Sequence, residues 1–283
     1  MFFEGRVFES HPLTIANAPS SVSCVASRSI VLGARVKGDW TRALNRYASM
    51  EQGRLASESG EKVDAVQVPV HVMIDGPYGG CGLDLGEYEN VLLVAGGAGV
   101  TFTLGLLDDL VGRVVRHQRW RGERTRRVEF AWAIRSFGEQ LFYIYYPWIA
   151  QQLIFLDDIQ WFLPLITDIV DAVANSSLHL HISLFVTCQC GDLPPVPNAT
   201  VTSTRPDVHQ LLTHVISPTY GEDDVEDDGR ASREGFICTG GVGVCASGPE
   251  GLTREAANAV ARLAPTYGTR VGGIVLHTEV FSL

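Results

Sequence analysis

A glycine cluster between a strand-like run and a helix-like run is the segment of this sequence best suited to chemistry. Residues 91–101 read VLLVAGGAGVT, and Gly96, Gly97 and Gly99 follow five apolar residues. Glycine permits a tight turn and close backbone approach to a ligand, and a helix beginning at Thr101 would point free N–H groups at that ligand. The segment therefore predicts a dinucleotide pyrophosphate site. Its spacing is not the full GxGxxG, and a glycine turn without a ligand is the alternative.

Two Gly-Pro turns accompany this cluster. The first contains Gly76 and Pro77 in DGPYG, and the second contains Gly248 and Pro249 in ASGPE. Pro249 suits the first position of a helix. Each turn is expected to end a strand at the carboxyl edge of a sheet, where open α/β sheets bind ligands.

The elements that must position these turns alternate after residue 90. Strand-like runs cover residues 91–95, 128–134, 178–187, part of 236–246, and 271–276, and helix-like runs cover 101–117, 158–174, 207–216 and 249–264. Strands separated by helices pair in parallel through crossovers. The sequence therefore predicts an α/β, Rossmann-like, doubly wound parallel sheet.

The part before residue 90 differs in character. Short β-like runs cover residues 11–16, 29–36 and 68–74. Mixed polar, proline-rich and acidic stretches at residues 45–67, 191–206 and 221–234 are predicted to be loops.

Composition excludes several classes of protein. The chain has 283 residues, of which 46% are hydrophobic, so it can form a packed core. A net charge of -10 argues against nucleic acid or an anionic membrane surface as the main partner. Six cysteines without a CxxC pair predict reduced thiols rather than a metal site. The apolar run at residues 141–156 is interrupted by two glutamines and is shorter than the ~18 residues of a membrane span. The chain as written is therefore expected to be soluble.

The segments HPLT, RVKGDWT, DGPYG, GGAGVT, FAWAIR and SGPEGL occur in this order. Their order and spacing resemble the ferredoxin–NADP reductase superfamily, and within it the ferric reductases and NADPH oxidases. The resemblance implies a partial antiparallel β-barrel that binds FAD in residues 1–87, followed by an NADP-binding domain in residues 88–283. It also implies that electrons pass from NADPH through FAD to ferric iron. The partner would be a haem-binding membrane domain that this chain lacks, at the cytoplasmic face of the plasma membrane.

By the resemblance, the flavin contacts come from two segments. His11, Pro12, Leu13 and Thr14 match the motif at the flavin ring, with the Thr14 hydroxyl near the reactive nitrogen, although Leu13 replaces the usual Phe. Four further residues match the FAD-phosphate segment, in which an arginine can bind phosphate bidentately and a threonine can lie at a helix N-terminus: Arg35, Gly38, Trp40 and Thr41.

The resemblance also assigns the nucleotide contacts. Gly97, Gly99 and Thr101 would hold the pyrophosphate. Gly96, Val100 and the two Gly-Pro turns are further candidates for cofactor binding. Arg135 ends the FAWAIR segment and is the expected partner of the NADPH 2′-phosphate.

Two further positions match the catalytic region of the family. Ser247 stands where the family usually has the Cys of Cys-Gly-Pro near the nicotinamide, and Cys245 should point the same way along a strand and partly substitute for it. Phe281 is the candidate aromatic that covers the flavin, with packing into the core as its alternative.

The sequence departs from the family pattern in two places. Only ten residues precede His11, so the barrel is expected to be incomplete, with unpaired edges. Residues 138–157 form an aromatic-rich insertion, which we interpret as a translated intron or, if real protein, as an association surface. Two other interpretations stay open: a superoxide-forming NADPH oxidase, and a truncated, non-catalytic nucleotide-binding remnant.

Overall fold

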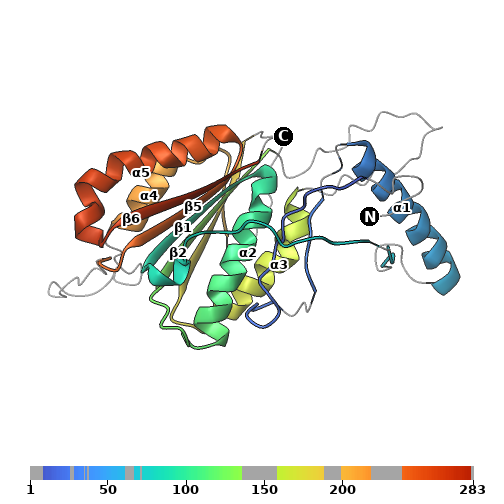
Figure 1. Cartoon of the computed structure of the whole chain (residues 1–283), viewed down its shortest axis with the longest axis horizontal. Helices are drawn as coiled ribbons and strands as arrows, with labels where there is room; N and C mark the ends of the chain where they lie inside the picture. The colour runs from blue at the N-terminus through green and yellow to red at the C-terminus, as the bar shows by residue number, and fades with distance from the viewer. Residues whose placement is uncertain are drawn as a thin grey trace, which may run out of the picture. The chain divides into compact units, whose positions relative to one another are not determined.

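The computed structural model describes residues 9–25, 29–34, 36, 38–60, 67–70, 72–135, 158–187, 199–217 and 238–281. The chain divides into two compact units (Figure 1). Unit 1 comprises Met1–Thr14 and Leu32–Gly80, and unit 2 comprises Ile15–Val31 and Cys81–Leu283. The acidic stretch 221–234 and the insertion 138–157 lie outside the described residues.

Unit 2 contains a six-stranded sheet in which every neighbouring pair is parallel. Its strand order is β4-β3-β2-β1-β5-β6. The strands are β1 (Asn90–Gly96), β2 (Arg127–Ile134), β3 (His179–Val186), β4 (Ala199–Thr202), β5 (Val242–Gly248) and β6 (Ile274–Val280). The predicted parallel sheet is confirmed.

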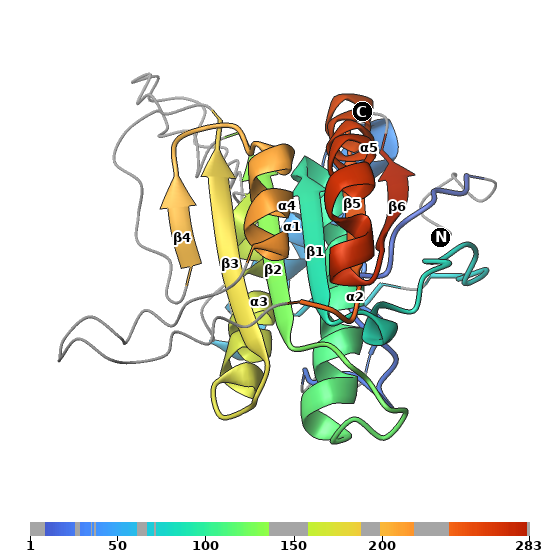
Figure 2. The same cartoon turned by 90° about the vertical axis from the view of Figure 1, so that its left-hand side faces the viewer.

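Helices cover both faces of this sheet. On one face lie α2 (Val100–Val111), which continues through η4 (Gly112–Arg116), and α3 (Asp158–Val173). The other face carries α4 (Val208–Ile216) and α5 (Glu250–Val271), which stand in front of the sheet in Figure 2. This two-sided cover is the doubly wound arrangement that the alternation of strands and helices predicted.

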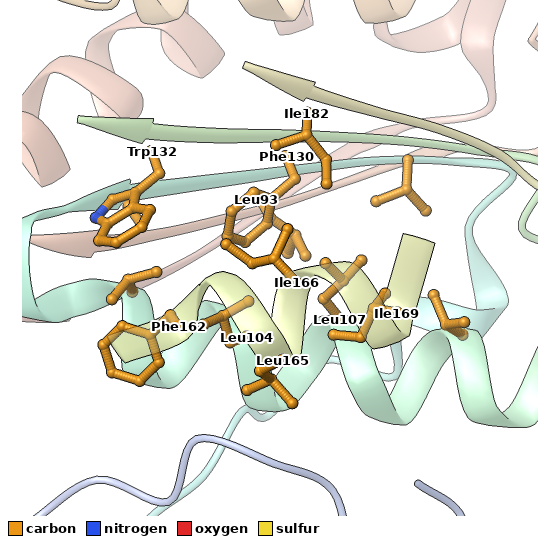
Figure 3. Packing of buried hydrophobic residues seen from close by; sticks show 14 of the residues in the cluster. Leu93, Leu104, Leu107, Phe130, Trp132, Phe162, Leu165, Ile166, Ile169 and Ile182 are labelled. Carbon is orange, nitrogen blue, oxygen red and sulfur yellow. The ribbon is translucent and has the colours of Figure 1, made fainter. Parts of the chain in front are cut away.

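Two hydrophobic cores result, because successive side chains of a strand point to opposite faces. Along β1, Leu93 belongs to the core beneath α2 and α3, whereas Leu92 and Val94 belong to the core beneath α4 and α5. Trp132 lies at one end of the first core, where its ring meets the edge of Phe162 with centroids 6.1 Å apart (Figure 3). The apolar runs of the central strands are buried on both faces, as a parallel sheet requires.

The strand order places a topological switch point between β1 and β5. From β1 the chain builds outward through β2, β3 and β4, and then returns to place β5 and β6 on the other side of β1. Connections therefore leave the carboxyl ends of β1 and β5 in opposite directions, and open α/β sheets bind ligands at such a switch point.

Three features of unit 2 differ from the prediction: strand β4, the end of α5 and the start of β6. Strand β4 lies within the stretch 191–206, which was predicted to be a loop, because its Thr and Val residues pair with β3 from Ile182 onward. Helix α5 runs past its predicted end at residue 264 to Val271, where Gly272 with φ 82° ends it. The last strand consequently begins at Ile274 rather than at residue 271.

The loop predicted at residues 45–67 is wrong over most of its length. Helix α1 (Asp39–Ser59) occupies residues 45–59, and Gly60 with φ 72° caps its end. The single Gly53 costs the helix only ~1 kcal/mol, and the many Ala, Leu, Met, Glu and Arg residues around it favour a helix.

The β-like runs before residue 90 do not form strands among the described residues, and the predicted antiparallel barrel is not confirmed. The described residues of the run at 68–74 form no ladder with another described segment. Apolar alternation alone does not make a strand, since ladder hydrogen bonds require a neighbouring strand. In unit 2, Ala16 donates its N–H to the Val31 carbonyl oxygen over 2.8 Å.

Residues 18–24 are bonded to α2 through one buried carboxylate. Asp108 is fully buried, and its Oδ2 accepts hydrogen bonds from the Ala18 N–H (2.8 Å) and the Ser23 hydroxyl (2.7 Å). Its Oδ1 accepts from the Cys24 N–H (2.9 Å) and thiol (3.1 Å). Four donors therefore hold this segment against α2.

Candidate functional site at the switch point

The glycine cluster forms a short 3₁₀ turn, η3 (Gly97–Gly99), between β1 and α2. Gly97 has φ 52°, a conformation that favours glycine, and the space beside its α-carbon is open. Helix α2 begins at Val100, and its N-cap residue Gly99 has no side chain with which to cap the first N–H groups. No side chain therefore caps this helix N-terminus, and a helix N-terminus is an element that binds anions through backbone N–H groups.

The second Gly-Pro turn meets this loop from the end of β5. Gly248 has φ 152°, and the position that its Cβ would take lies 3.0 Å from backbone atoms of Gly96. A Cβ on Gly96 would in turn lie 2.9 Å from the ring of Pro249. The turns after β1 and β5 are about 150 residues apart in the chain yet touch at the switch point. This contact agrees with the prediction that both turns lie at the carboxyl edge of one sheet.

Two side-chain hydrogen bonds hold the loop in place. The Trp132 indole donates from Nε1 to the Gly97 carbonyl oxygen over 3.1 Å. The Thr101 hydroxyl donates to the Ala98 carbonyl oxygen over 3.0 Å. Sequence reasoning missed Trp132, although its place in FAWAIR, on the strand beside β1, was a usable signal.

Ser247 is wholly buried at this junction. Its Oγ has no hydrogen-bond partner among the described residues. A buried hydroxyl without a partner costs free energy, and a ligand group that pairs with it would offset that cost. Together with the side-chain-free surface at Gly97, this unpaired hydroxyl fits a nicotinamide dinucleotide at the switch point.

Phe281 and Arg135 lie near the same edge of the sheet. The Phe281 N–H donates to the Gly248 carbonyl oxygen over 2.9 Å, and the residue is half-buried directly after β6. Arg135 directly follows β2, the strand next to β1, and is exposed. Cys245 shares a face with Ser247, as expected two residues earlier on a strand, but it belongs to the core beneath α2.

The described flavin candidates lie in unit 1. His11 stacks on the buried Trp40 ring, with centroids 4.3 Å apart and planes at 29°. Gly38 is the N-cap of α1, and Thr41 accepts a hydrogen bond from the Gly38 N–H over 3.1 Å. The RVKGDWT segment therefore leads into a helix N-terminus, the element that phosphate binding favours. Trp40 Nε1 is buried without a partner in the described part of unit 1, so a polar FAD group can pair with it.

The other flavin candidates have fewer contacts. Pro12 and Leu13 are exposed, and Thr14 is half-buried. Gly76 and Pro77 lie in an exposed segment without regular secondary structure, and Gly76 has φ 132°. The prediction that this turn ends a strand is therefore wrong for the described residues. Arg35 lies outside the described residues.

Comparison with known families agrees with this geometry. Residues 2–81 match the family model of an FAD-binding domain, and residues 88–144 match that of a ferric reductase NAD binding domain. The chain is related to the ferric reductases and NADPH oxidases. Its cofactors are accordingly FAD and a nicotinamide dinucleotide.

Curated relatives include both branches of this family. Ferric reduction oxidase 8, mitochondrial, of Arabidopsis thaliana is 28% identical over 64% of the chain and 19% of the relative. Respiratory burst oxidase homolog protein D of Solanum tuberosum is 26% identical over 62% of the chain and 19% of the relative. The chain thus spans about a fifth of the length of these ferric reductase and oxidase relatives.

Solved structures include the CS-b5R domains of human Ncb5or, with TM-score 0.46 and 14% identity over 95% of this chain and 55% of the other. A ferredoxin NADP+ reductase from Neisseria gonorrhoeae has TM-score 0.34 and 11% identity over 69% of this chain and 57% of the other. Among the described residues, no helix combines the length and the apolar character that crossing a bilayer requires.

Proposed function

We propose that this chain is the electron-input part of a ferric-chelate reductase, which passes electrons from NADPH through FAD towards ferric iron. The observation that carries the proposal is the meeting of two glycine turns at the β1/β5 switch point, over a buried and unpaired Ser247 hydroxyl. The matches to an FAD-binding domain and a ferric reductase NAD binding domain support it.

The protein's task in such a reaction is to bind and align. When bound, the two cofactors supply hydride and electron transfer themselves. The η3 turn and the start of α2 would hold the nucleotide pyrophosphate through backbone N–H groups. The Ser247 hydroxyl, fixed at the end of β5, would orient the nicotinamide end.

Arg135 is proposed to select NADPH over NADH. An exposed guanidinium directly after β2 can pair with a 2′-phosphate through charge-assisted hydrogen bonds, which NADH cannot offer. Phe281 is proposed to cover the flavin ring, and its backbone bond to Gly248 keeps it at the carboxyl edge of the sheet.

In unit 1 we propose that His11, Pro12, Leu13 and Thr14 contact the flavin ring and that the start of α1 receives the FAD phosphates. Arg35 and the Gly76–Pro77 turn would complete that site. We propose residues 1–87 as the FAD-binding domain, built on an antiparallel barrel as in relatives, and residues 88–283 as the NADP-binding domain. A haem-binding membrane domain at the cytoplasmic face of the plasma membrane would receive the electrons.

The second candidate is the input part of a superoxide-forming NADPH oxidase. The respiratory burst oxidases among the relatives favour it. The two candidates differ only in the final acceptor, so joining the chain to a haem domain and measuring ferric-chelate reduction against superoxide formation separates them.

The third candidate is a non-catalytic nucleotide-binding remnant. Leu13 and Ser247, which replace residues usual in the family, and the absence of a barrel ladder among the described residues favour it. One experiment separates the enzyme from the remnant. The full chain is purified, its flavin absorbance is recorded, and NADPH is added without oxygen. Retained yellow colour that bleaches with NADPH supports the enzyme, whereas colourless protein, or colour that NADPH does not bleach, supports the remnant.

A further inference from the structure

Two cysteines far apart in the sequence have their side chains in contact. The sulfur atoms of Cys81 and Cys245 are 3.7 Å apart, and both residues carry free thiols. Cys245 is fully buried on β5, two residues before Ser247, while Cys81 precedes η2 (Leu85–Glu87) and is half-buried. Cys81 packs against the core cluster to which Cys245 belongs. The pair therefore has one sulfur within reach of solvent and one sulfur behind it.

The surroundings of the pair distinguish the two sulfur atoms. His277, which pairs in register with Cys245 on the neighbouring β6, lies 5.7 Å from Phe102 between ring centroids. Its Nε2 is 3.1 Å from Glu279 Oε1. The hydrogen bond from Cys245 lowers the pKa of Cys81 to about 6, against the opposing effect of its own burial. The same bond and burial raise the pKa of Cys245 far above its usual range.

We propose that Cys81 and Cys245 form an oxidation site at which a hydroperoxide converts the two thiols to a disulfide. The inference goes beyond the proposed electron transfer and does not depend on it. It follows from the contact between the sulfur atoms and from their unequal exposure. A thiolate that reaches solvent, backed by a second thiol, is the arrangement of a reactive cysteine with its resolving partner.

The reaction balances in two steps. The Cys81 thiolate attacks one peroxide oxygen, the O–O bond breaks, and the departing oxygen takes a proton from water, leaving Cys81 as a sulfenic acid. The Cys245 sulfur then attacks the Cys81 sulfur, the S–O bond breaks, and hydroxide leaves with the Cys245 proton as water. Two thiols are oxidised and one peroxide is reduced to water and an alcohol, or to two waters with hydrogen peroxide. The sulfur atoms must approach from 3.7 Å to ~2.05 Å, which a modest shift of Cys81 allows.

The test uses the full chain, reduced and then exposed to a small excess of hydrogen peroxide. Digestion without reducing agent, followed by mass spectrometry, should show a peptide pair joined through Cys81 and Cys245. With Cys245→Ala, Cys81 should stop at a sulfenic acid that dimedone traps. With Cys81→Ser, neither product should form.

Two controls make the test decisive. Cys24→Ser should leave the joined peptide unchanged, because the Cys24 thiol donates to Asp108 and its pKa is raised. Alkylation of Cys81 by iodoacetamide should titrate near pH 6 and be slower below it, as the thiolate is protonated. Circular dichroism confirms that each variant is folded. If peroxide gives no Cys81–Cys245 bond in the folded wild-type chain, or joins other cysteines in its place, the proposal is overturned.

Discussion

Gly99 and Ser247 are in direct backbone contact: the space that a Cβ on Gly99 would occupy is filled by the carbonyl group of Ser247. This contact joins the first turn of α2 to the end of β5. It fixes the separation of the two turns that form the nucleotide site.

Replacing Gly99 by Ala should disrupt this contact. The added methyl group must displace the Ser247 backbone, which we expect to lower the free energy of unfolding by about 1–3 kcal/mol and to weaken NADPH binding. Urea unfolding and nucleotide titration measure the two effects. Gly251→Ala is the matched control, because a Cβ there meets nothing within 4 Å. Since Gly251 lies in α5, its replacement by Ala should leave the stability unchanged or raise it by up to ~1 kcal/mol. Equal effects of the two substitutions would contradict the contact.

Ser247→Ala should slow the reaction with NADPH without destabilising the folded chain. Since Ser247 Oγ is buried without a partner in the described structure, its removal should leave the stability of the free chain unchanged or raise it by up to ~1 kcal/mol. The rate of flavin bleaching by NADPH should fall about tenfold if the hydroxyl orients the nicotinamide.

A second buried serine supplies the comparison. The Ser183 hydroxyl donates to Glu129 Oε1 over 3.1 Å, so Ser183→Ala should destabilise the chain by ~1 kcal/mol and leave the bleaching rate unchanged. If Ser247→Ala lost stability in the same way, the hydroxyl would have a structural partner.

Arg135→Ala should weaken the binding of NADPH more than that of NADH. Loss of charge-assisted bonds to the 2′-phosphate is expected to raise the Kd for NADPH by about 10-fold to 100-fold, with little change for NADH. Isothermal titration with both nucleotides measures this difference. Arg262→Ala, at an exposed position on α5, should change neither affinity. Equal losses for both nucleotides would remove Arg135 from the 2′-phosphate role.

Asp108→Asn should loosen residues 15–25 from α2. The amide nitrogen would face either the donors of Ala18 and Ser23 or those of Cys24, in place of a carboxylate oxygen. We therefore expect the free energy of unfolding to fall by about 3 kcal/mol. Hydrogen exchange should increase first in residues 15–25. Asp171→Asn, an exposed position on α3, should cost less than ~0.5 kcal/mol. Unchanged protection of residues 15–25 in Asp108→Asn would contradict the anchoring role.

Local pattern was sufficient to predict most elements of unit 2. The apolar runs of β1 and β2 and the helical stripes of α2 and α5 are periodic over enough residues to identify their type without the fold. The secondary structure of unit 1 was harder to predict. Helix α1 contains Gly53, Ser57 and Ser59, residue types that are common in loops, and its caps, Gly38 and Gly60, were not identified from the sequence.

The sequence by itself determined the alternation of strands and helices, the positions of the glycine turns and hence the class of ligand, because these depend on residues close together in the chain. Only the tertiary structure decided which turns meet. The contact of Gly99 with Ser247, the approach of Cys81 to Cys245, and the four bonds to Asp108 each join segments more than 80 residues apart. Such pairs depend on strand order and packing of the whole sheet, and no short window of the sequence contains both partners.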